Sequence, residues 1–550
     1  MNIKIIRTLI IVGLLLSFAS KINLEPLITT PSRSLAYDSN LSVQSEPQSK
    51  ISYIKHTPKM EINSSLAADS APSYFFPFIP YYRKLPDLRS PFSLQIAALN
   101  QVLPDAMAQE NGSSVKYQSL GSALKDSGAD WLRVRVEWET IEPNEPLPGE
   151  QQEYFWQYHD EALRLVAETG VRIIATLSDS PSWAANVPCA PIYSDRLDEF
   201  ARYLTDLVNR YKVPPYQIKH WELVNEPDSN RYTFGHISGH GCWAYDGDQY
   251  AKMLKVANQA IKKADPHAAV LMGGIAYDWF EEYGGPFNRY FPDDVMENGG
   301  GFSIDALNLH FYPDFSAEWD RWNPESDDRQ YAWIPAPTCG IVDDGVGNSY
   351  DVEGFDIVAK TTHYRNRMNT CYGVAKPVWV TEVGAHGYPD DQASLDNQAR
   401  YVVKVYARAL SAGVQNITWF SLDRPPYDRF GQSLLNSDYS PKPAYFAYQT
   451  LTSELDGFYE YSRNRNSCVW GSSGVSCDVE AYIFKNDGQD VKTVAWGSRT
   501  LKFSASKLRV VNRNGIESTI KDGGRGDVDR TVNGIVKLQL SDEPVFISKR

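Results

Sequence analysis

Residues 218–227 read IKHWELVNEP, a short apolar strand that ends on an Asn-Glu-Pro corner. A second apolar strand, PVWVTEVG at 377–384, also carries a glutamate at its end. The C-terminal tips of neighbouring parallel strands in a barrel face the same mouth. If both strands belong to one barrel, Glu226 and Glu382 lie across that mouth from each other.

The rest of the chain supplies the other strands of such a barrel. Helical patterns separate them, and two of these helices end on a glycine directly before the next strand, at Gly170 and Gly413. We therefore expect a (β/α)₈ barrel over residues 91–455. The alternative, a doubly wound open sheet, would need a switch point, and no Gly-rich phosphate loop marks one. The eight expected strands are Phe92–Ala98, Trp131–Trp138, Val171–Leu177, Ile218–Val224, Ala268–Gly274, Ile304–Phe311, Pro377–Glu382 and Asn416–Leu422.

The two ends of the chain differ from this central part. Residues 456–550 show short alternating strands and a hairpin signal at 486–488, which predicts a small all-β, sandwich-like domain. Residues 21–90 are polar and lack periodicity, as in a linker or tether. Residues 1–20 combine an early positive charge, a short apolar run and small residues, which is typical of a signal peptide. The sequence thus predicts export, with an uncleaved anchor as the alternative.

Charge and composition exclude several classes of partner. The net charge of −14 argues against nucleic acid or an anionic membrane surface. The apolar run near the start is short for a membrane span, so we expect none after signal removal. Aromatic residues make up 13% of the chain, which suits stacking on sugar rings as well as ordinary packing. The oligomeric state is not predicted.

The cysteines fit an exported protein. None has CxxC or Cys/His spacing, and the paired aspartates at 327–328 and 343–344 lack an EF-hand loop, so we expect no metal. Six cysteines allow fifteen pairings. Our hypothesis is pairing in chain order among Cys189, Cys242, Cys339, Cys371, Cys468 and Cys477.

Two carboxylates at one barrel mouth are the groups that glycosidic cleavage requires. One protonates the departing oxygen, and the other faces the anomeric carbon. We assign Glu226 as general acid and then base, and Glu382 as nucleophile of a retaining, two-step displacement. This chemistry needs no cofactor, and the expected partner is a carbohydrate. As single residues, Glu226 could be an ordinary loop residue and Glu382 a solvated strand end.

The same residues resemble the clan A glycoside hydrolases. Besides the Asn225-Glu226-Pro227 corner and Glu382, the resemblance rests on His310-Phe311-Tyr312 after the sixth strand and on Trp419 in the eighth. It covers about 120 to 455 and is nearest to family 39, with family 5 next. At the third strand tip, residues 178–183 lack the histidine that family 5 usually has there.

The resemblance implies roles for further residues. Asn225 is expected to bind the sugar 2-hydroxyl, and Tyr312 to donate to Glu382. Arg133 is expected beneath the nucleophile, and Arg135 has the same strand parity and remains an alternative. His310 belongs to the same site or lies behind it. The candidates for a sugar platform are Trp138, Trp183 and Trp419.

Two other function classes remain open in the sequence. A non-catalytic carbohydrate-binding barrel would keep the fold, but such a protein would typically have lost one of the carboxylates, and both are present here. A transglycosylase would use the same two glutamates and differ only in the acceptor.

Overall fold

The computed structural model describes residues 90–96, 99, 119–147, 152–230, 241–281, 284–313, 356–423, 431–471 and 474–550. The expected signal peptide and, apart from Ser90, the expected linker lie outside these residues. The chain divides into two units, 1–77 and 78–550, and all that follows concerns the second.

Eight parallel strands form the centre of the molecule, as the sequence predicts. Their order is β5-β4-β3-β2-β1-β8-β7-β6. Parallel bridges from Leu271 to Ala306 and from Ile275 to Leu309 join β5 to β6 and close the barrel. The strands are β1 (Phe92–Gln95), β2 (Trp131–Glu137), β3 (Arg172–Ser178), β4 (His220–Leu223), β5 (Ala269–Met272), β6 (Leu307–Phe311), β7 (Val378–Val383) and β8 (Val414–Trp419).

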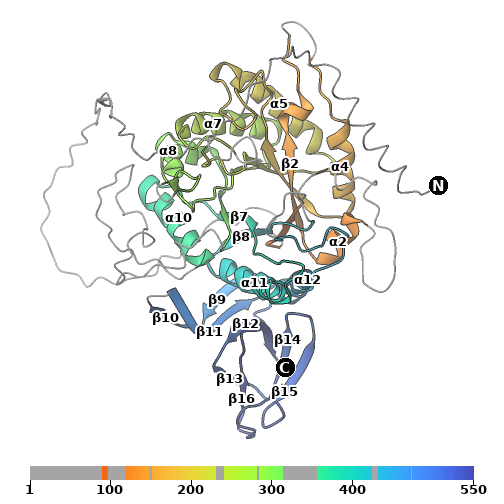
Figure 1. Ribbon diagram of the computed structural model, residues 1–550, viewed down its shortest axis with the longest axis vertical. Coiled ribbons are helices and arrows are strands. Elements are labelled where there is room, and N and C mark those ends of the chain that lie inside the picture. Colours follow the sequence, from red (N-terminus) through yellow and green to blue (C-terminus); the bar gives the residue numbers. More distant parts are fainter. Residues whose placement is uncertain are drawn as a thin grey trace, which may run out of the picture. The chain divides into compact units, whose positions relative to one another are not determined.

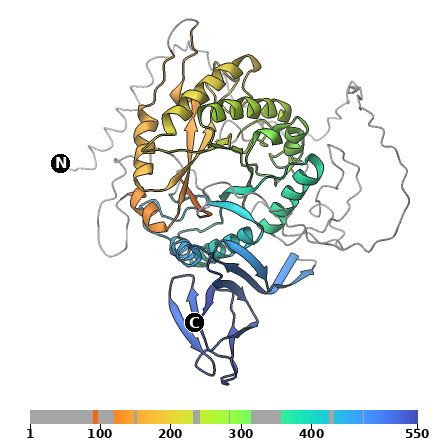
Figure 2. The same cartoon turned by 180° about the vertical axis from the view of Figure 1, so that it is seen from behind.

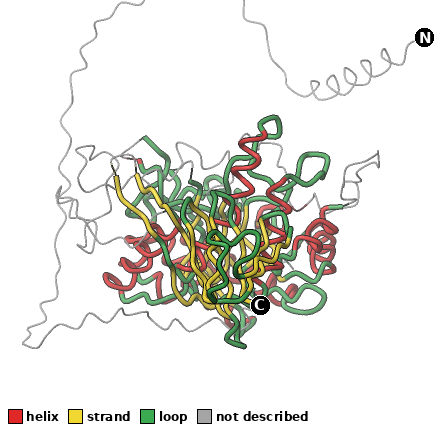
Figure 3. Tube along the Cα trace, turned by 90° about the horizontal axis from the view of Figure 1, so that it is seen from below, coloured by secondary structure: helices red, strands yellow, loops and turns green. Residues whose placement is uncertain are grey.

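Helices cover the outside of this barrel, so that the strands lie inside a ring of helices (Figures 1 and 3). In α5, for example, the buried residues include Phe200, Leu204 and Val208, which recur at helical spacing on one side of the helix. The ring contains α2 (Leu120–Ser127), α3 (Trp138–Ile141), α4 (Gln157–Glu168), α5 (Leu197–Tyr211), α7 (Gly247–Ala264), α8 (Phe291–Glu297), α10 (Ile357–Tyr372), α11 (Gln392–Ser411) and α12 (Pro443–Leu455), with 3₁₀ turns η2 (Ser194–Arg196) and η4 (Gly300–Ser303).

The pairing of β6 with β7 shifts by one residue next to the site. Leu309 pairs with Val380, but His310 pairs with Glu382, so Thr381 is the extra residue. Such irregularities re-aim side chains beside active sites. Here the shift lets the side chains of Thr381 and Glu382 both reach groups inside the barrel: Thr381 Oγ1 donates to Glu222 Oε1 at 3.2 Å.

The C-terminal strands form antiparallel β sheets, called the β domain below, as expected for an all-β end. One sheet runs β10-β11-β12-β17-β14-β15 with β9 on β11, and β13 pairs with β16. Leu508, Val536 and Ile547 belong to its own buried cluster. The strands are β9 (Glu460–Asn464), β10 (Ser467–Gly471), β11 (Gly474–Lys485), β12 (Val491–Gly497), β13 (Thr500–Ser504), β14 (Lys507–Asn512), β15 (Glu517–Lys521), β16 (Ile535–Gln539) and β17 (Val545–Lys549).

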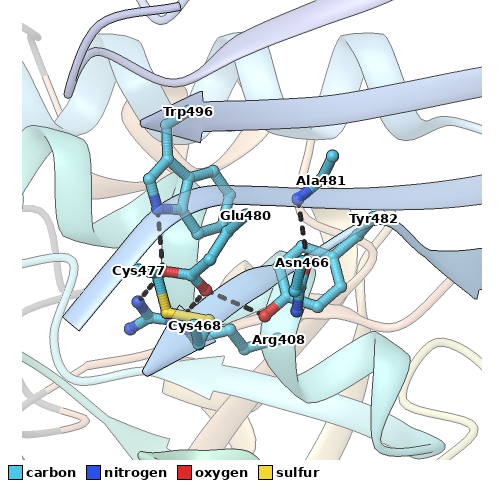
Figure 4. Close-up of a disulfide and its surroundings, with 8 residues drawn as sticks. All are labelled: Arg408, Asn466, Cys468, Cys477, Glu480, Ala481, Tyr482 and Trp496. Atoms are coloured by element: carbon cyan, nitrogen blue, oxygen red, sulfur yellow. Dashed lines mark hydrogen bonds and ion pairs between the residues drawn. A yellow bond between two sulfur atoms is a disulfide. The ribbon is translucent and has the colours of Figure 1, made fainter. Parts of the chain in front are cut away.

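A buried ion pair joins this domain to the barrel. Arg408 of α11 donates to both carboxylate oxygens of Glu480 in β11, at 2.9 and 2.7 Å. Glu480 also accepts from Trp496 Nε1 at 3.0 Å and from the Tyr482 hydroxyl at 2.9 Å (Figure 4). The view from behind shows the blue strands next to α11 and α12 (Figure 2). Each carboxylate oxygen of Glu480 therefore accepts one bond from the barrel and one from the β domain.

Two of the three expected disulfides lie within the described residues. Cys189 bonds Cys242, and Cys468 bonds Cys477. Both agree with pairing in chain order. The third expected pair includes Cys339, which lies outside the described residues. Among the described residues, no helix is long and apolar enough to span a membrane.

Candidate active site

The tip of β4 is a strained corner that carries Glu226. Val224 and Glu226 both have positive φ, 69° and 44°, a region that residues with a Cβ rarely adopt. Two backbone bonds hold the corner: Glu226 N donates to Gly274 O at 2.9 Å, and Gly241 N to Asn225 O at 2.5 Å. Strain of this kind persists where the surroundings over-determine it, and it concentrates at functional sites.

Glu226 is almost fully buried, with 4% of its surface exposed. Its Oε1 lies 2.9 Å from Nδ1 of His310, which is at the C-terminal end of β6. The other ring nitrogen, Nε2, is 3.2 Å from Oγ1 of Thr381. The imidazole therefore bridges the two strands that carry the two glutamates.

Glu382 is held by two donors. Nη1 of Arg133 donates to its Oε1 at 2.6 Å, and the Tyr312 hydroxyl donates to its Oε2 at 2.6 Å. Burial and the charge of Glu382 raise the pKa of Tyr312 well above its usual range, so the hydroxyl keeps its proton. A buried guanidinium and a phenol therefore each donate to one oxygen of this carboxylate and fix its orientation.

Arg133 distributes its donors over three further partners. Nε and Nη2 bind Glu222 at 2.7 and 2.8 Å, Nη1 also donates to Gln95 Oε1 at 2.6 Å, and Nη2 donates to Asn225 Oδ1 at 2.7 Å. Burial opposes the charge of Arg133, but the attraction of Glu222 and Glu382 outweighs it and raises its pKa. Glu222, also fully buried, has a lowered pKa because Arg133 more than offsets the cost of burial.

Arg135 lies elsewhere in the mouth. Its Nε donates to Ser178 Oγ at 3.0 Å and its Nη2 is ion-paired with Asp179. The structure thus places Arg133, and not Arg135, beneath the nucleophile candidate. The motifs in the sequence did not single out Glu222. It lies in the strand before the Glu226 corner, two residues after His220, so the side chains of Glu222 and His220 point to the same side of the strand.

Two of the three tryptophan platform candidates are corrected by the structure. Trp138 is 2% exposed and stacks on Tyr203 of α5, in the helix layer. Trp419 is fully buried and donates from Nε1 to Gln432 O at 3.0 Å. Trp183 is half-buried and packs edge-on against Trp138. An enclosed indole offers no face to a sugar, so Trp138 and Trp419 cannot act as platforms in this structure.

Phe420 is the aromatic residue that the tip of β8 does present to the site. Trp419 is in register with Val383, one residue past Glu382, and side chains alternate along a strand, so it faces away from Glu382. The next residue, Phe420, is half-buried and packs edge-on against Tyr312, with ring centroids 6.2 Å apart. The sequence alone could not have identified Phe420, because the choice between Trp419 and Phe420 depends on how β8 is aligned with β7, and the sequence does not contain that alignment.

Glu226, His310 and Glu382 come close together. One ligand atom of each lies within 4.8 Å of the others, which makes this the only group of three potential metal ligands found among the described residues. Arg133 touches Glu382 from inside the barrel and disfavours a second positive charge there. The arrangement suits two carboxylates acting on one organic substrate.

Known proteins share this domain and fold. Residues 95–422, more than half of the chain, match the family model described as cellulase, glycosyl hydrolase family 5. A curated relative is furostanol glycoside 26-O-beta-glucosidase of Hellenia speciosa, 27% identical over 189 residues. The match covers 30% of this chain and 33% of the relative, so it spans about a third of that protein's length.

Solved structures show the same fold. A family 39 glycoside hydrolase from the gut symbiont Bacteroides cellulosilyticus WH2 is 19% identical, with TM-score 0.55, covering 84% of this chain and 81% of the other. The GH30 xylanase C catalytic domain of Talaromyces cellulolyticus is 14% identical, with TM-score 0.52 and coverage of 85% and 97%. The expected likeness to clan A is confirmed, with family 39 among the similar folds. The chain belongs to the cellulase family, glycosyl hydrolase family 5.

Proposed function

We propose that this protein is an exported, retaining glycosidase that cleaves β-linked glycosides by double displacement. The observation that carries the proposal is the separation of the two carboxylates: Glu226 and Glu382 offer oxygens within 4.8 Å of each other. Inverting enzymes keep their carboxyl groups about 6.5–9.5 Å apart to admit a water, whereas retaining enzymes keep them about 5–5.5 Å apart.

In the first step Glu382 attacks the anomeric carbon. The bond to the leaving oxygen breaks, and Glu226 gives its proton to that oxygen. Glu382 suits attack because Arg133 and Tyr312 each donate to one of its oxygens and fix its direction. Glu226 is buried and its Oε1 lies 2.9 Å from Nδ1 of His310, which fixes the carboxyl group in place for proton transfer to the leaving oxygen.

In the second step a water molecule takes the place of the leaving group. Glu226, now ionised, removes a proton from this water as it attacks the anomeric carbon. The bond to Glu382 breaks, and the sugar leaves with its original anomeric configuration. No further reactant is needed.

Asn225 and Phe420 are the proposed sugar contacts. Oδ1 of Asn225 accepts from Arg133, and this orients the amide so that Nδ2 is the atom that donates to a sugar hydroxyl. Phe420 presents an aromatic ring beside Tyr312 and replaces Trp419 as the proposed platform. Trp183 stays a candidate at the edge of the site.

The substrate class and the location rest on further observations. The family description names cellulases, and the curated relative is named as a β-glucosidase, which supports β-linked glucosides as the first substrates to test. The two disulfides support an oxidising compartment and hence export.

The test is the stereochemistry of the reaction. Wild type and Glu382→Gln are incubated with aryl β-glucosides and β-glucan oligosaccharides, and the first-formed anomer is followed by proton NMR. We expect the β-anomer from wild type and no product from the variant. A first-formed α-anomer, or full activity in Glu382→Gln, would contradict the mechanism; added alcohol acceptors in the same assay reveal any transglycosylation.

A further inference from the structure

A fully buried lysine lies directly behind the proposed acid/base. Lys360, in the first turn of α10, has no exposed surface. Its ammonium group lies among the tips of β5 and β6. Neither of the catalytic steps uses it.

All three donors of this ammonium have partners. Nζ donates to the backbone carbonyl of His310 at 2.8 Å, to Asp278 Oδ2 at 2.9 Å, and to the backbone carbonyl of Ala276. A lysine ammonium has three protons to donate, so the group is fully used. Lys360 therefore ties β6, at the residue that contacts Glu226, to the segment that follows β5.

A buried carboxylate ties that segment to β4 in turn. Asp228 stands two residues after Glu226 and is fully buried. Its Oδ1 and Oδ2 accept from the backbone N–H groups of Ala276 and Tyr277, at 3.1 and 2.9 Å. Three hydrogen-bonded links join Glu226 to His310, His310 to Lys360 and Lys360 to Ala276. Ala276 then bonds Asp228, from which the chain itself leads back over two residues to Glu226 and closes a ring of contacts.

This ring leaves His310 little freedom. A Cβ at Gly274 would lie 2.2 Å from Nε2 of His310, so the imidazole packs directly on the backbone after β5. On the backbone side of His310, Lys360 Nζ binds the carbonyl oxygen of His310 itself. A shift of this carbonyl would therefore move the imidazole that holds Glu226.

Burying the lysine is costly, so Lys360 is a poor choice if its role is only to stabilise the fold. Removing an ammonium and a carboxylate from water costs several kcal/mol per ion, and apolar replacements of buried ion pairs are often neutral or stabilising. What Lys360 supplies that an apolar residue cannot is the pair of bonds to the carbonyls of Ala276 and His310. These bonds fix geometry at the proposed acid/base.

We propose that Lys360 is a positioning residue that sets the placement of Glu226 through His310. The inference rests on the proposed function, because it assumes that Glu226 is the acid/base. It predicts that losing Lys360 damages proton transfer to the leaving group and leaves attack by Glu382 intact. His310 Nδ1 also lies 3.5 Å from Glu382 Oε2, but Glu382 is held mainly by the shorter bonds from Arg133 and Tyr312, at 2.6 Å each.

The experiment compares kcat/KM on two aryl β-glucosides, one with a good leaving group and one with a poor one. This constant reports the steps up to formation of the glycosyl-enzyme, where only the poor leaving group needs acid help. For Lys360→Met we expect a loss of about 100-fold on the poor leaving group, the size that a small misplacement produces, and less than threefold on the good one. The alkaline limb of the pH profile should shift for the poor substrate alone.

Two further variants separate position from folding. Lys492 is the matched control: it is also buried, and from β12 it pairs with Glu454 Oε2 of α12 at 2.9 Å, away from the catalytic glutamates. Lys492→Met should change thermal stability and leave the ratio of the two kcat/KM values at the wild-type value. Lys360→Met with Asp278→Asn removes both charges of the buried ion pair and should keep the selective loss.

The outcomes also distinguish this inference from the proposed function. If wild type cleaves both substrates and Glu226→Ala shows the selective loss, the function stands. Equal loss on both substrates in Lys360→Met, or failure of the double variant to fold, would then overturn the positioning role alone. If Glu226→Ala shows no selective loss, the assignment of the acid/base itself fails.

Discussion

The two ends of the barrel interior are built from opposite kinds of side chain. At the N-terminal end, Trp131 of β2 packs edge-on against Trp379 of β7, and His220 of β4 stacks on Trp379 with centroids 5.4 Å apart. Two residues further along the same strands stand Arg133 and Glu222, joined by two short hydrogen bonds. A step of two residues is about 6.6 Å along a strand.

The difference separates stability from chemistry within one strand. The lower layer is neutral: burial lowers the pKa of His220 to about 3, so it packs there as an uncharged ring. The upper layer is charged, and each charge has a partner of the opposite sign. Barrels of this type place catalysis at the C-terminal end and stability at the other, so substitutions in the two layers should have separable effects.

The largest expected effect is on activity, from the upper layer. Glu382→Gln removes the nucleophile and keeps the shape of the side chain, so we expect kcat to fall by about 10,000-fold or more. The midpoint of thermal unfolding should stay within a few degrees of wild type. Steady-state kinetics with an aryl glycoside and a melting curve measure both; a large loss of stability would show that the two layers are not separable.

The corresponding change in the lower layer is Trp379→Ala. Because the ring is fully buried between Trp131 and His220, we expect the free energy of unfolding to fall by about 3–5 kcal/mol. Under conditions where the variant is folded, kcat per folded molecule should match wild type. Denaturant unfolding with an activity assay on the same sample tests this, and a kcat reduced more than about threefold would contradict the separation.

The sequence predicted the fold and the two carboxylates for the same reason. Both depend on local patterns: apolar strands alternating with amphipathic helices, and a glutamate at a strand tip. The sequence could not decide whether Arg133 or Arg135 contacts Glu382. The two are two residues apart in β2, so their side chains point to the same side of the strand, and they differ only in depth along the barrel. Depth depends on register with the neighbouring strands, a tertiary property.

The aromatic residues show the same limit. Trp419 matched a family pattern, but its register with Val383 turns it away from the site and leaves Phe420 there. Lys360 carried no signal at all, because a single lysine in a helix is usually solvated. Only the structure shows that it is buried behind His310.

The neutral histidine of the lower layer predicts a pH dependence of stability. The unfolded chain takes up a proton near pH 6.5, while the folded state resists it down to about pH 3. The unfolded state therefore binds more protons in this window, and stability is lost as pH falls through it. At pH 4.5 the loss is about 3 kcal/mol for a shift of about two pH units. The free energy of unfolding, measured with urea from pH 7.5 to 4.5, should fall less steeply with falling pH in His220→Phe than in wild type. An equal pH dependence in both proteins would assign the acid sensitivity to other groups.

The smallest expected effect separates the two neighbouring aromatic residues at the tip of β8. Phe420→Ala should lower kcat/KM by about tenfold, the worth of one aromatic contact with the substrate, and leave stability nearly unchanged because the ring is only half-buried. Trp419→Phe should do the reverse, since this indole is enclosed and donates to Gln432. Parallel kinetics and melting curves compare them. If Trp419→Phe lowered kcat/KM and Phe420→Ala did not, the assignment of the platform to Phe420 would be wrong, and the register between β7 and β8 would no longer explain which ring meets the sugar.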